Sequence, residues 1–345
     1  MKRVPLHENP DRATILKRLI LAVVLIAVCI AGAVLIGRYL DRNRSADEPR
    51  GDLDTRFTAA PVIEYNGAQY QPKKNLTAIL LMGTDHYTDE MSADDSYRNG
   101  GQADFLVLLV VDEDEQSITP VQIDRDTLAE VTILGVLGNE TGTRQTQICL
   151  AHGFGDGKTQ SCALQRDAVS RLLFGVTIPY YIAMRLDGIS TLNDAVGGVT
   201  VTIADDFTKL DPLMKTGATL KLQGKQAEYF VRNRMDIGVG TNEARGKRQT
   251  QYWDAMVQLI DQRLKEEDDT DFLNIILDEL DPFLTSNLSK GRLINELWSD
   301  RNYTRQSMVH LEGAYATGED GFVEFHTNEA ALKALVMNLF YQKIT

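Results

Sequence analysis

Four charged residues stand at the ends of apolar segments, where their side chains could meet. Asp85 follows one apolar run, and Arg125 and Asp126 follow another. Asp104 precedes a third run, which places it at the same edge if that strand is antiparallel to the first. Ligands of open α/β sheets gather outside the carboxyl ends of strands, so these residues are candidates for binding or catalysis. The alternative for any one of the aspartates is a turn or capping residue.

A second group of candidates is basic. Five cations fall between positions 232 and 248, namely Arg232, Arg234, Arg245, Lys247 and Arg248. Gln249 follows Arg245 by four residues and shares its face of the predicted helix. Guanidinium groups bind phosphate oxygens in a bidentate way, so this concentration of arginine in an acidic chain indicates an anion site. The alternative is a solvent-exposed helix face paired with carboxylates such as Asp236 and Glu243.

Other catalytic signatures are missing from the sequence. It has no Gly-x-x-x-x-Gly-Lys-Ser/Thr loop, no His-Glu-x-x-His and no Gly-x-Ser-x-Gly. The five histidines are too scattered to predict a zinc site. The net charge of −13 also argues against nucleic acid as a partner, because phosphate binding without sequence preference needs a basic surface.

The elements that must position the candidates alternate between strands and helices. Continuous apolar runs predict strands buried on both faces at 76–82, 105–111 and 117–123. Later segments predict strands at 180–185 and 199–204. Helical patterns occupy 167–174, 187–196, 224–232, 245–265 and 328–341. This alternation predicts an α/β fold, a three-layer α/β/α domain around a central mixed sheet.

The N-terminal region predicts a membrane protein. Residues 19–37 carry no charge, and 19 residues in a helix span the hydrocarbon layer of a bilayer. The run exceeds the apolar core of a cleavable signal peptide, so we expect one uncleaved transmembrane signal anchor. Residues 1–18 would form a cytoplasmic tail, 38–72 an extracytoplasmic stalk, and 73–345 an extracytoplasmic domain. The expected location is the cell membrane, crossed once.

Two cysteines, Cys149 and Cys162, belong to the part of the chain expected outside the cell. A disulfide between them is favoured in that oxidising setting. The alternative is two buried free thiols.

Seven segments in order resemble the LytR–CpsA–Psr family of cell-wall glycopolymer ligases. They are Ile79-Leu80-Leu81-Met82-Gly83-Thr84-Asp85, Ala103-Asp104-Phe105, Arg125-Asp126-Thr127, Gly197-Gly198-Val199, Leu222-Gln223-Gly224-Lys225-Gln226-Ala227, Tyr229-Phe230-Val231-Arg232-Asn233-Arg234 and Arg245-Gly246-Lys247-Arg248-Gln249. No single segment is very specific, but their order is. The resemblance covers a core at 75–265, and 266–345 looks like a C-terminal extension.

The resemblance implies an α/β/α domain with an apolar tunnel for a polyprenyl chain. Members of the family are thought to transfer a glycopolymer from a polyprenyl-pyrophosphate carrier to peptidoglycan with the help of Mg2+. By resemblance Asp85 and Asp104 are the metal ligands, and Asp126 orients Arg125 or acts as a base. The residues expected around the pyrophosphate are Arg125, Arg232, Arg234, Arg245 and Gln249. A non-catalytic scaffold that binds wall polymer or polyprenyl phosphate is the alternative function.

Three departures from the family pattern bear on the metal site. Gln102 stands where members often have arginine, and Asn242 stands where they often have aspartate. The segment between Asp85 and Asp104 is longer than usual and contains Asp94 and Asp95, either of which could replace Asp85. Cys149 stands where members commonly have asparagine, which supports the pairing with Cys162.

Overall fold

A mixed sheet of seven strands forms the centre of the molecule. The computed structural model describes residues 62–85, 101–135, 138–233, 242–266, 270–319 and 321–344. The strand order is β11 (Leu284–Ser286), β8 (Tyr180–Arg185), β3 (Leu76–Thr84), β4 (Ala103–Asp112), β5 (Ser117–Ile123) and β12 (Thr304–Arg305), and β13 (Val309–His310) also pairs with β5. Strand β3 is antiparallel to β4 and parallel to β8, so the predicted mixed sheet is confirmed.

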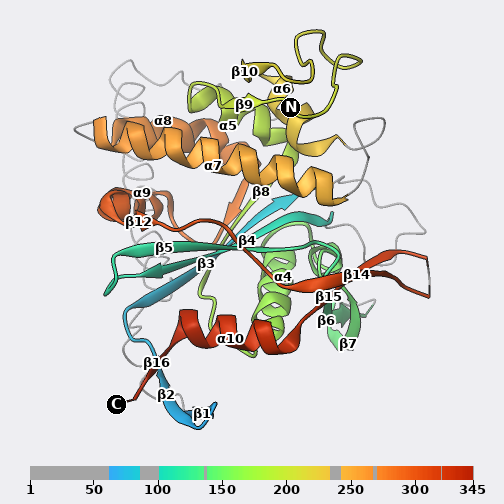
Figure 1. Cartoon of the computed structure of the whole chain (residues 1–345), viewed down its shortest axis with the longest axis vertical. Coiled ribbons are helices and arrows are strands. Elements are labelled where there is room, and N and C mark those ends of the chain that lie inside the picture. The colour runs from blue at the N-terminus through green and yellow to red at the C-terminus, as the bar shows by residue number, and fades with distance from the viewer. Residues whose placement is uncertain are drawn as a thin grey trace, which may run out of the picture. The chain divides into compact units, whose positions relative to one another are not determined.

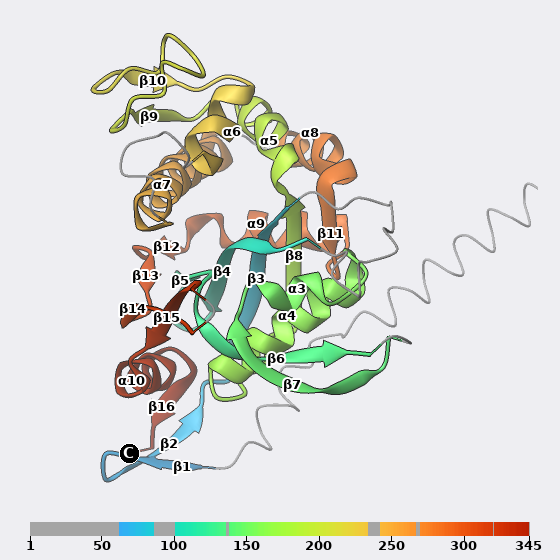
Figure 2. The ribbon, with the colours of Figure 1, turned by 90° about the vertical axis from the view of Figure 1, so that its right-hand side faces the viewer.

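Helices lie on both sides of this sheet (Figures 1 and 2). On one side are α3 (Leu150–Gly153), α4 (Thr159–Leu172) and α10 (Glu329–Phe340). On the other are α5 (Ile189–Ala195), α6 (Lys225–Arg232), α7 (Asn242–Glu266) and α8 (Asp271–Leu280). Helix α9 (Lys290–Ser299) follows α8, and short 3-10 turns occupy Leu186–Gly188, Asp281–Phe283 and Asp300–Asn302.

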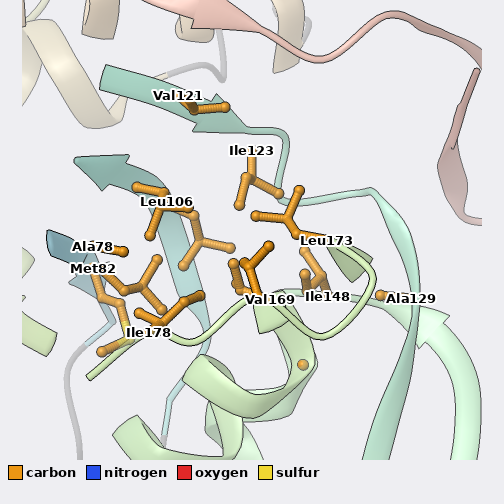
Figure 3. Close-up of a cluster of buried hydrophobic side chains, with 14 of the residues drawn as sticks. Ala78, Met82, Leu106, Val121, Ile123, Ala129, Ile148, Val169, Leu173 and Ile178 are labelled. Carbon is orange, nitrogen blue, oxygen red and sulfur yellow. The ribbon is translucent and has the colours of Figure 1, made fainter. Parts of the chain in front are cut away.

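The face of the sheet toward α4 and α10 is densely packed. Alternate residues of β3 and β4, among them Ala78, Met82 and Leu106, meet Val169 of α4 and Val336 of α10 in one cluster. Figure 3 shows part of this cluster, with side chains from the sheet and from α4 pointing toward one another. This apolar core fixes the sheet, and therefore the strand ends that carry the candidate residues.

The opposite face of the sheet is packed differently. A small cluster of Ile79, Tyr180 and Leu288 is buried there, with Leu81 and Ile182 partly buried against it. Helices α5 to α9 instead build a separate core of their own, around Phe207, Phe230 and Tyr252. The helices on this side therefore do not cover the sheet completely, and a cavity remains between the apolar face of the sheet and α7.

Hairpins complete the fold at its margins. They are β6 (Leu128–Leu134) with β7 (Glu140–Gln147), β9 (Thr200–Thr202) with β10 (Thr219–Lys221), and β14 (Gly313–Thr317) with β15 (Val323–Thr327). Two short strands lie at the end of the predicted stalk. Residues 63–72 form β1 (Ile63–Tyr65) and β2 (Ala68–Pro72), and β2 pairs with the C-terminal β16 (Tyr341–Lys343). The turn is Asn66-Gly67, both with positive φ, which is a turn typical of hairpins.

The predicted tail at 1–18, the anchor at 19–37 and the stalk up to residue 61 lie outside the described residues. Among the residues that the structure describes, no helix is long and apolar enough to span a membrane.

Candidate active site

The two predicted metal-binding aspartates meet at one edge of the sheet. Asp85 follows the last residue of β3, and its amide donates to the carbonyl of Gln102, 3.0 Å away. In the antiparallel pairing of β3 with β4, Gly83 faces Phe105 and Thr84 faces Ala103, so Asp104 is the extra residue of a β-bulge. Bulges redirect side chains and are frequent beside active sites. The expected antiparallel arrangement of these two strands is confirmed.

Arg125, which follows β5, contacts the start of β4 and the residue before α3 through its guanidinium group. It forms an ion pair with Asp104 and donates to the amide oxygen of Gln102 at 2.5 Å. Its Nη2 also lies 3.5 Å from Sγ of Cys149. Gln102, which departs from the family pattern, thus supplies an acceptor where an arginine would supply another cation. The local charge balance is therefore less positive than the resemblance implied.

Asp126 is buried next to Arg125 and is shielded from solvent. Its side chain is 3% exposed, and Oδ1 lies 3.4 Å from Nε of Arg125. The amide of Gln147 on β7 donates to the same Oδ1 at 3.1 Å and to the carbonyl of Val323 on β15 at 2.6 Å. The backbone N–H of Phe325 donates to the carbonyl of Asp126 at 2.8 Å. Of the two roles expected for Asp126, this geometry favours orienting Arg125.

The arginines of α6 and α7 face the same carboxylates. Arg232 is the last residue of α6. Its Nη1 lies 2.7 Å from Oε1 of Glu228, and its Nη2 lies 3.9 Å from Oδ1 of Asp85. Burial, and then the charge of Asp104, raises the pKa of Asp85 above its ordinary value, while Arg232, Arg125 and Arg245 each lower it. The opposing charges show that these five side chains form one electrostatic cluster.

Gln249 and Arg248 of α7 stabilise the packing of α7 against α6. Gln249 donates from its amide to the carbonyl of Val231, 3.2 Å away, which ties α7 to α6. Arg248 is 3% exposed, pairs with Asp205 at 2.8 Å, and donates to the backbone carbonyls of Phe230 and Asn233. Arg248 therefore fixes the end of α6, and with it the position of Arg232. Sequence spacing alone does not separate this buried residue from the cations of the site.

Some predicted site residues are not described. Arg234, Asp94 and Asp95 lie outside the described residues, and so does the side chain of Asn242. Sequence reasoning, in turn, missed Gln147. The alternation of Leu128–Leu134, followed by polar Glu140–Gln147, was the available signal for the hairpin that carries it.

The predicted disulfide is wrong for this structure. Cys149 and Cys162 are both free and buried. Their sulfur atoms face different groups, because Cys149 contacts Arg125 and Cys162 lies 3.8 Å from Nε2 of His152. Burial raises the pKa of each thiol to about 12, so both are protonated and unreactive at neutral pH.

An apolar cavity lies between the sheet and α7, and its lining includes the sequence neighbours of Asp104 and Arg232. Its inner part, of about 240 Å³, is lined by Gly83, Phe105 and Gln249 at the end nearest the site. Its outer part has a volume of about 500 Å³ and extends to Asp300 and Arg305. Both parts share the residues Leu81, Ile182, Trp253, Met256 and Leu293.

The carboxylates can be tested against the predicted metal. Among the described residues, no group of three or more histidine, cysteine, aspartate or glutamate side chains could hold a metal ion. Mg2+, however, is commonly bound by one or two carboxylates together with substrate phosphates and water. Asp104 raises the pKa of Asp85, so the two like charges are close enough to repel. Asp85 and Asp104 therefore fit a cation that arrives with a phosphate ligand.

Fold and site together define a class, an α/β protein with an apolar cavity and, beside residues of its lining, a cluster of arginines and aspartates. The model of the LytR_cpsA_psr family matches residues 45–339. The chain belongs to the LytR–CpsA–Psr family, as the sequence motifs indicated.

Curated relatives and solved structures agree with this assignment. The chain is 26% identical over 249 residues to the polyisoprenyl-teichoic acid–peptidoglycan teichoic acid transferase TagU of Halalkalibacterium halodurans, covering 72% of each chain. It is 28% identical over 239 residues to TagU of Bacillus cereus, covering 69% of each. TagV of B. subtilis has the same fold, with a TM-score of 0.58, 20% identity and coverage of 77% of this chain and 96% of that one. A Streptococcus agalactiae protein aligns with a TM-score of 0.61 and 22% identity, over 77% of this chain and 86% of that one.

Proposed function

We propose that this protein transfers a glycopolymer, of the teichoic acid class, from a polyprenyl-pyrophosphate carrier to peptidoglycan. One observation carries the proposal. An apolar cavity is lined by Phe105 and Val231, the immediate neighbours of Asp104 and Arg232, and these two charged residues form one electrostatic cluster with Asp85, Arg125 and Arg245. This combination matches an amphiphile with a long hydrocarbon chain and a pyrophosphate head group, since guanidinium groups suit phosphate oxygens. The names of the TagU relatives support the choice of teichoic acid and peptidoglycan.

In the proposed reaction a peptidoglycan hydroxyl attacks the phosphorus linked to the sugar, and polyprenyl phosphate leaves. Such transfers depend mainly on positioning and on neutralising charge. Arg232 and Arg245 would hold the pyrophosphate, and Arg125 would be kept in place by Asp126. Mg2+, bound by Asp85 and Asp104 with the phosphates, would supply further neutralisation. Arg234 belongs to the same proposal by resemblance.

The test of this function is turnover of a polyprenyl-pyrophosphate glycan by the purified full-length chain, with Mg2+ and with a chelator. Arg232→Ala should lower turnover by about a hundredfold, as for removal of a preorganised donor to developing charge. Arg232→Lys should recover part of the loss, because lysine keeps the charge but not the planar fork. If ionised Asp85 is required, Arg232→Ala should also move the acid limb of the pH profile to higher pH, since Arg232 lowers the pKa of Asp85.

Arg166→Ala is the matched control, because Arg166 pairs with Asp167 on α4, on the other side of the sheet. Normal turnover in both Arg232 variants would contradict the assignment. Tight binding of the lipid without any turnover in the unaltered chain would favour the non-catalytic scaffold instead.

The proposal includes a membrane anchor at residues 19–37. Its support is the uncharged run itself and a substrate whose hydrocarbon chain resides in a bilayer. Protease added to intact protoplasts should digest the chain beyond about residue 40 and spare the N-terminal tail. Protection of the whole chain would reject this topology.

A further inference from the structure

A second pocket, with charged, polar and aromatic side chains in its lining, lies beside the first turns of α7 and shares no lining residue with the apolar cavity. It has a volume of about 380 Å³ and lies between the end of β5, the first turns of α7, β13 and the β14–β15 hairpin. Its polar lining includes Gln122, Asp124, Thr250 and His310, and its aromatic lining consists of Tyr315 and Phe325. Pockets of this size hold small ligands.

The pocket adjoins the site and is separate from the apolar cavity, which is called the tunnel below. Asp124 precedes Arg125, and Gly246, which also lines the pocket, follows Arg245. On the same helix Gln249 lines the tunnel, whereas Thr250 lines the pocket and donates to Gln122 across it at 3.3 Å. The pocket and the apolar cavity therefore have separate linings, and each includes sequence neighbours of the arginine cluster.

The lining suits a sugar ring better than an anion or a lipid. The rings of Tyr315 and Phe325 lie 5.0 Å apart and form an aromatic wall, and the hydroxyl of Tyr315 donates to Asp124. A carboxylate, an amide, a hydroxyl and an imidazole offer both donors and acceptors, as sugar hydroxyls require. Asp124 and Lys247 bring charges of opposite sign to the lining, so it offers no excess of positive charge to a phosphate, and its polar side chains do not suit a hydrocarbon chain.

The position of the pocket beside the arginine cluster indicates which sugar it would bind. In phosphoryl transfer the attacking and leaving oxygens are roughly in line with the phosphorus. If polyprenyl phosphate departs along the tunnel, the nucleophile must arrive from another side of the arginine cluster. We propose that the pocket beside Asp124 binds the sugar of the acceptor glycan whose hydroxyl attacks. The inference rests on the proposed function.

The step balances within these two substrates. The acceptor oxygen forms a new bond to the sugar-linked phosphorus while the bond from that phosphorus to the oxygen of polyprenyl phosphate breaks. The hydroxyl proton ends on the departing phosphate. The products are a phosphodiester to the acceptor and a polyprenyl monophosphate.

The test uses the full-length chain with His310→Ala and Tyr315→Ala. Matched controls are His326→Ala and Phe322→Ala, which change an exposed histidine and an exposed aromatic residue outside the pocket lining. Three quantities are measured, namely the KM for a soluble peptidoglycan saccharide, the KM for the lipid donor, and the hydrolysis of the donor without acceptor. Binding of the saccharide is also followed by calorimetry, and folding by thermal unfolding.

We expect the pocket variants to raise the KM for the saccharide about five- to tenfold, as for loss of one hydrogen bond or ring contact. Calorimetry should show weaker binding to the same extent. A higher donor KM with an unchanged acceptor KM would overturn the proposal and place the donor's own sugar in the pocket. Unchanged values throughout would show that no substrate uses it. Failure of the proposed function looks different, because the unaltered chain would then neither transfer nor hydrolyse the donor.

Discussion

Replacing Arg125 with alanine is expected to lower turnover by at least about a hundredfold, and replacement with lysine by nearly as much. Arg125 contacts Asp104, Gln102 and Cys149 with the two nitrogens at its tip, and its Nε faces Asp126. A lysine has one compact ammonium group and cannot meet these partners together. The alanine variant would also leave Asp104 without its cationic partner, beside Asp85.

The measurement is turnover under saturating donor, together with thermal unfolding to show that the variants remain folded. Arg171→Ala is a suitable control, because Arg171 also bridges two partners, the carbonyl of Glu130 at 3.0 Å and the hydroxyl of Thr132 at 3.0 Å. Turnover in Arg125→Lys equal to that of the unaltered chain would mean that a charge alone suffices there, and would remove the orienting role given to Asp126.

A charge placed within the apolar cavity should discriminate between donors by the length of their hydrocarbon chains. Met256 lines both parts of the cavity. With Met256→Glu, a long polyprenyl donor should bind about a thousandfold more weakly, since displacing one five-carbon isoprene unit from apolar surface costs roughly 4 kcal/mol at about 0.8 kcal/mol per carbon. A donor with a very short chain does not reach Met256, so its KM should stay the same.

The dependence on chain length separates this effect from general damage. Leu213→Glu is the control, because Leu213 is 64% exposed and lines neither part of the cavity. Equal losses with long and short donors in Met256→Glu would point to distortion of the site and would argue against the cavity as the path of the hydrocarbon chain.

The sequence predicted the sheet well, because its strands are buried and continuous. The runs at 76–82, 105–111 and 117–123 correspond to β3, β4 and β5 within two residues at each end. Helix α7 was also foreseen, at 245–265 against Asn242–Glu266. Local periodicity is strong in such elements. The hairpin of β6 and β7 was missed, because Glu140–Gln147 is polar and mostly exposed, so that pairing rather than burial makes it a strand.

The site was predicted in part. The meeting of Asp85 with Asp104 followed from strand direction, and Arg125, Arg232 and Arg245 were identified by residue type and family resemblance. Roles that depend on distant contacts could not be read from the chain. The bond of Gln147 to Val323 spans 176 positions. The burial of Arg248 depends on α6 and Asp205, which no local pattern reveals. The disulfide failed because compartment and proximity in sequence do not fix where two sulfur atoms point.

The pairing of β2 with β16 bears on how the chain is made. One of the first strands of the described fold, Ala68–Pro72, completes its hydrogen bonds only with Tyr341–Lys343. The edge of β5 is likewise covered only by strands at 304–310. Contacts between such distant positions slow folding. During synthesis, the central sheet therefore keeps an open edge until residues 304–310 have emerged, and exposed edges invite pairing with other chains. Removal of residues 341–343 would leave one edge of β2 unpaired in its small sheet, and removal of 304–343 would also expose the edge of β5.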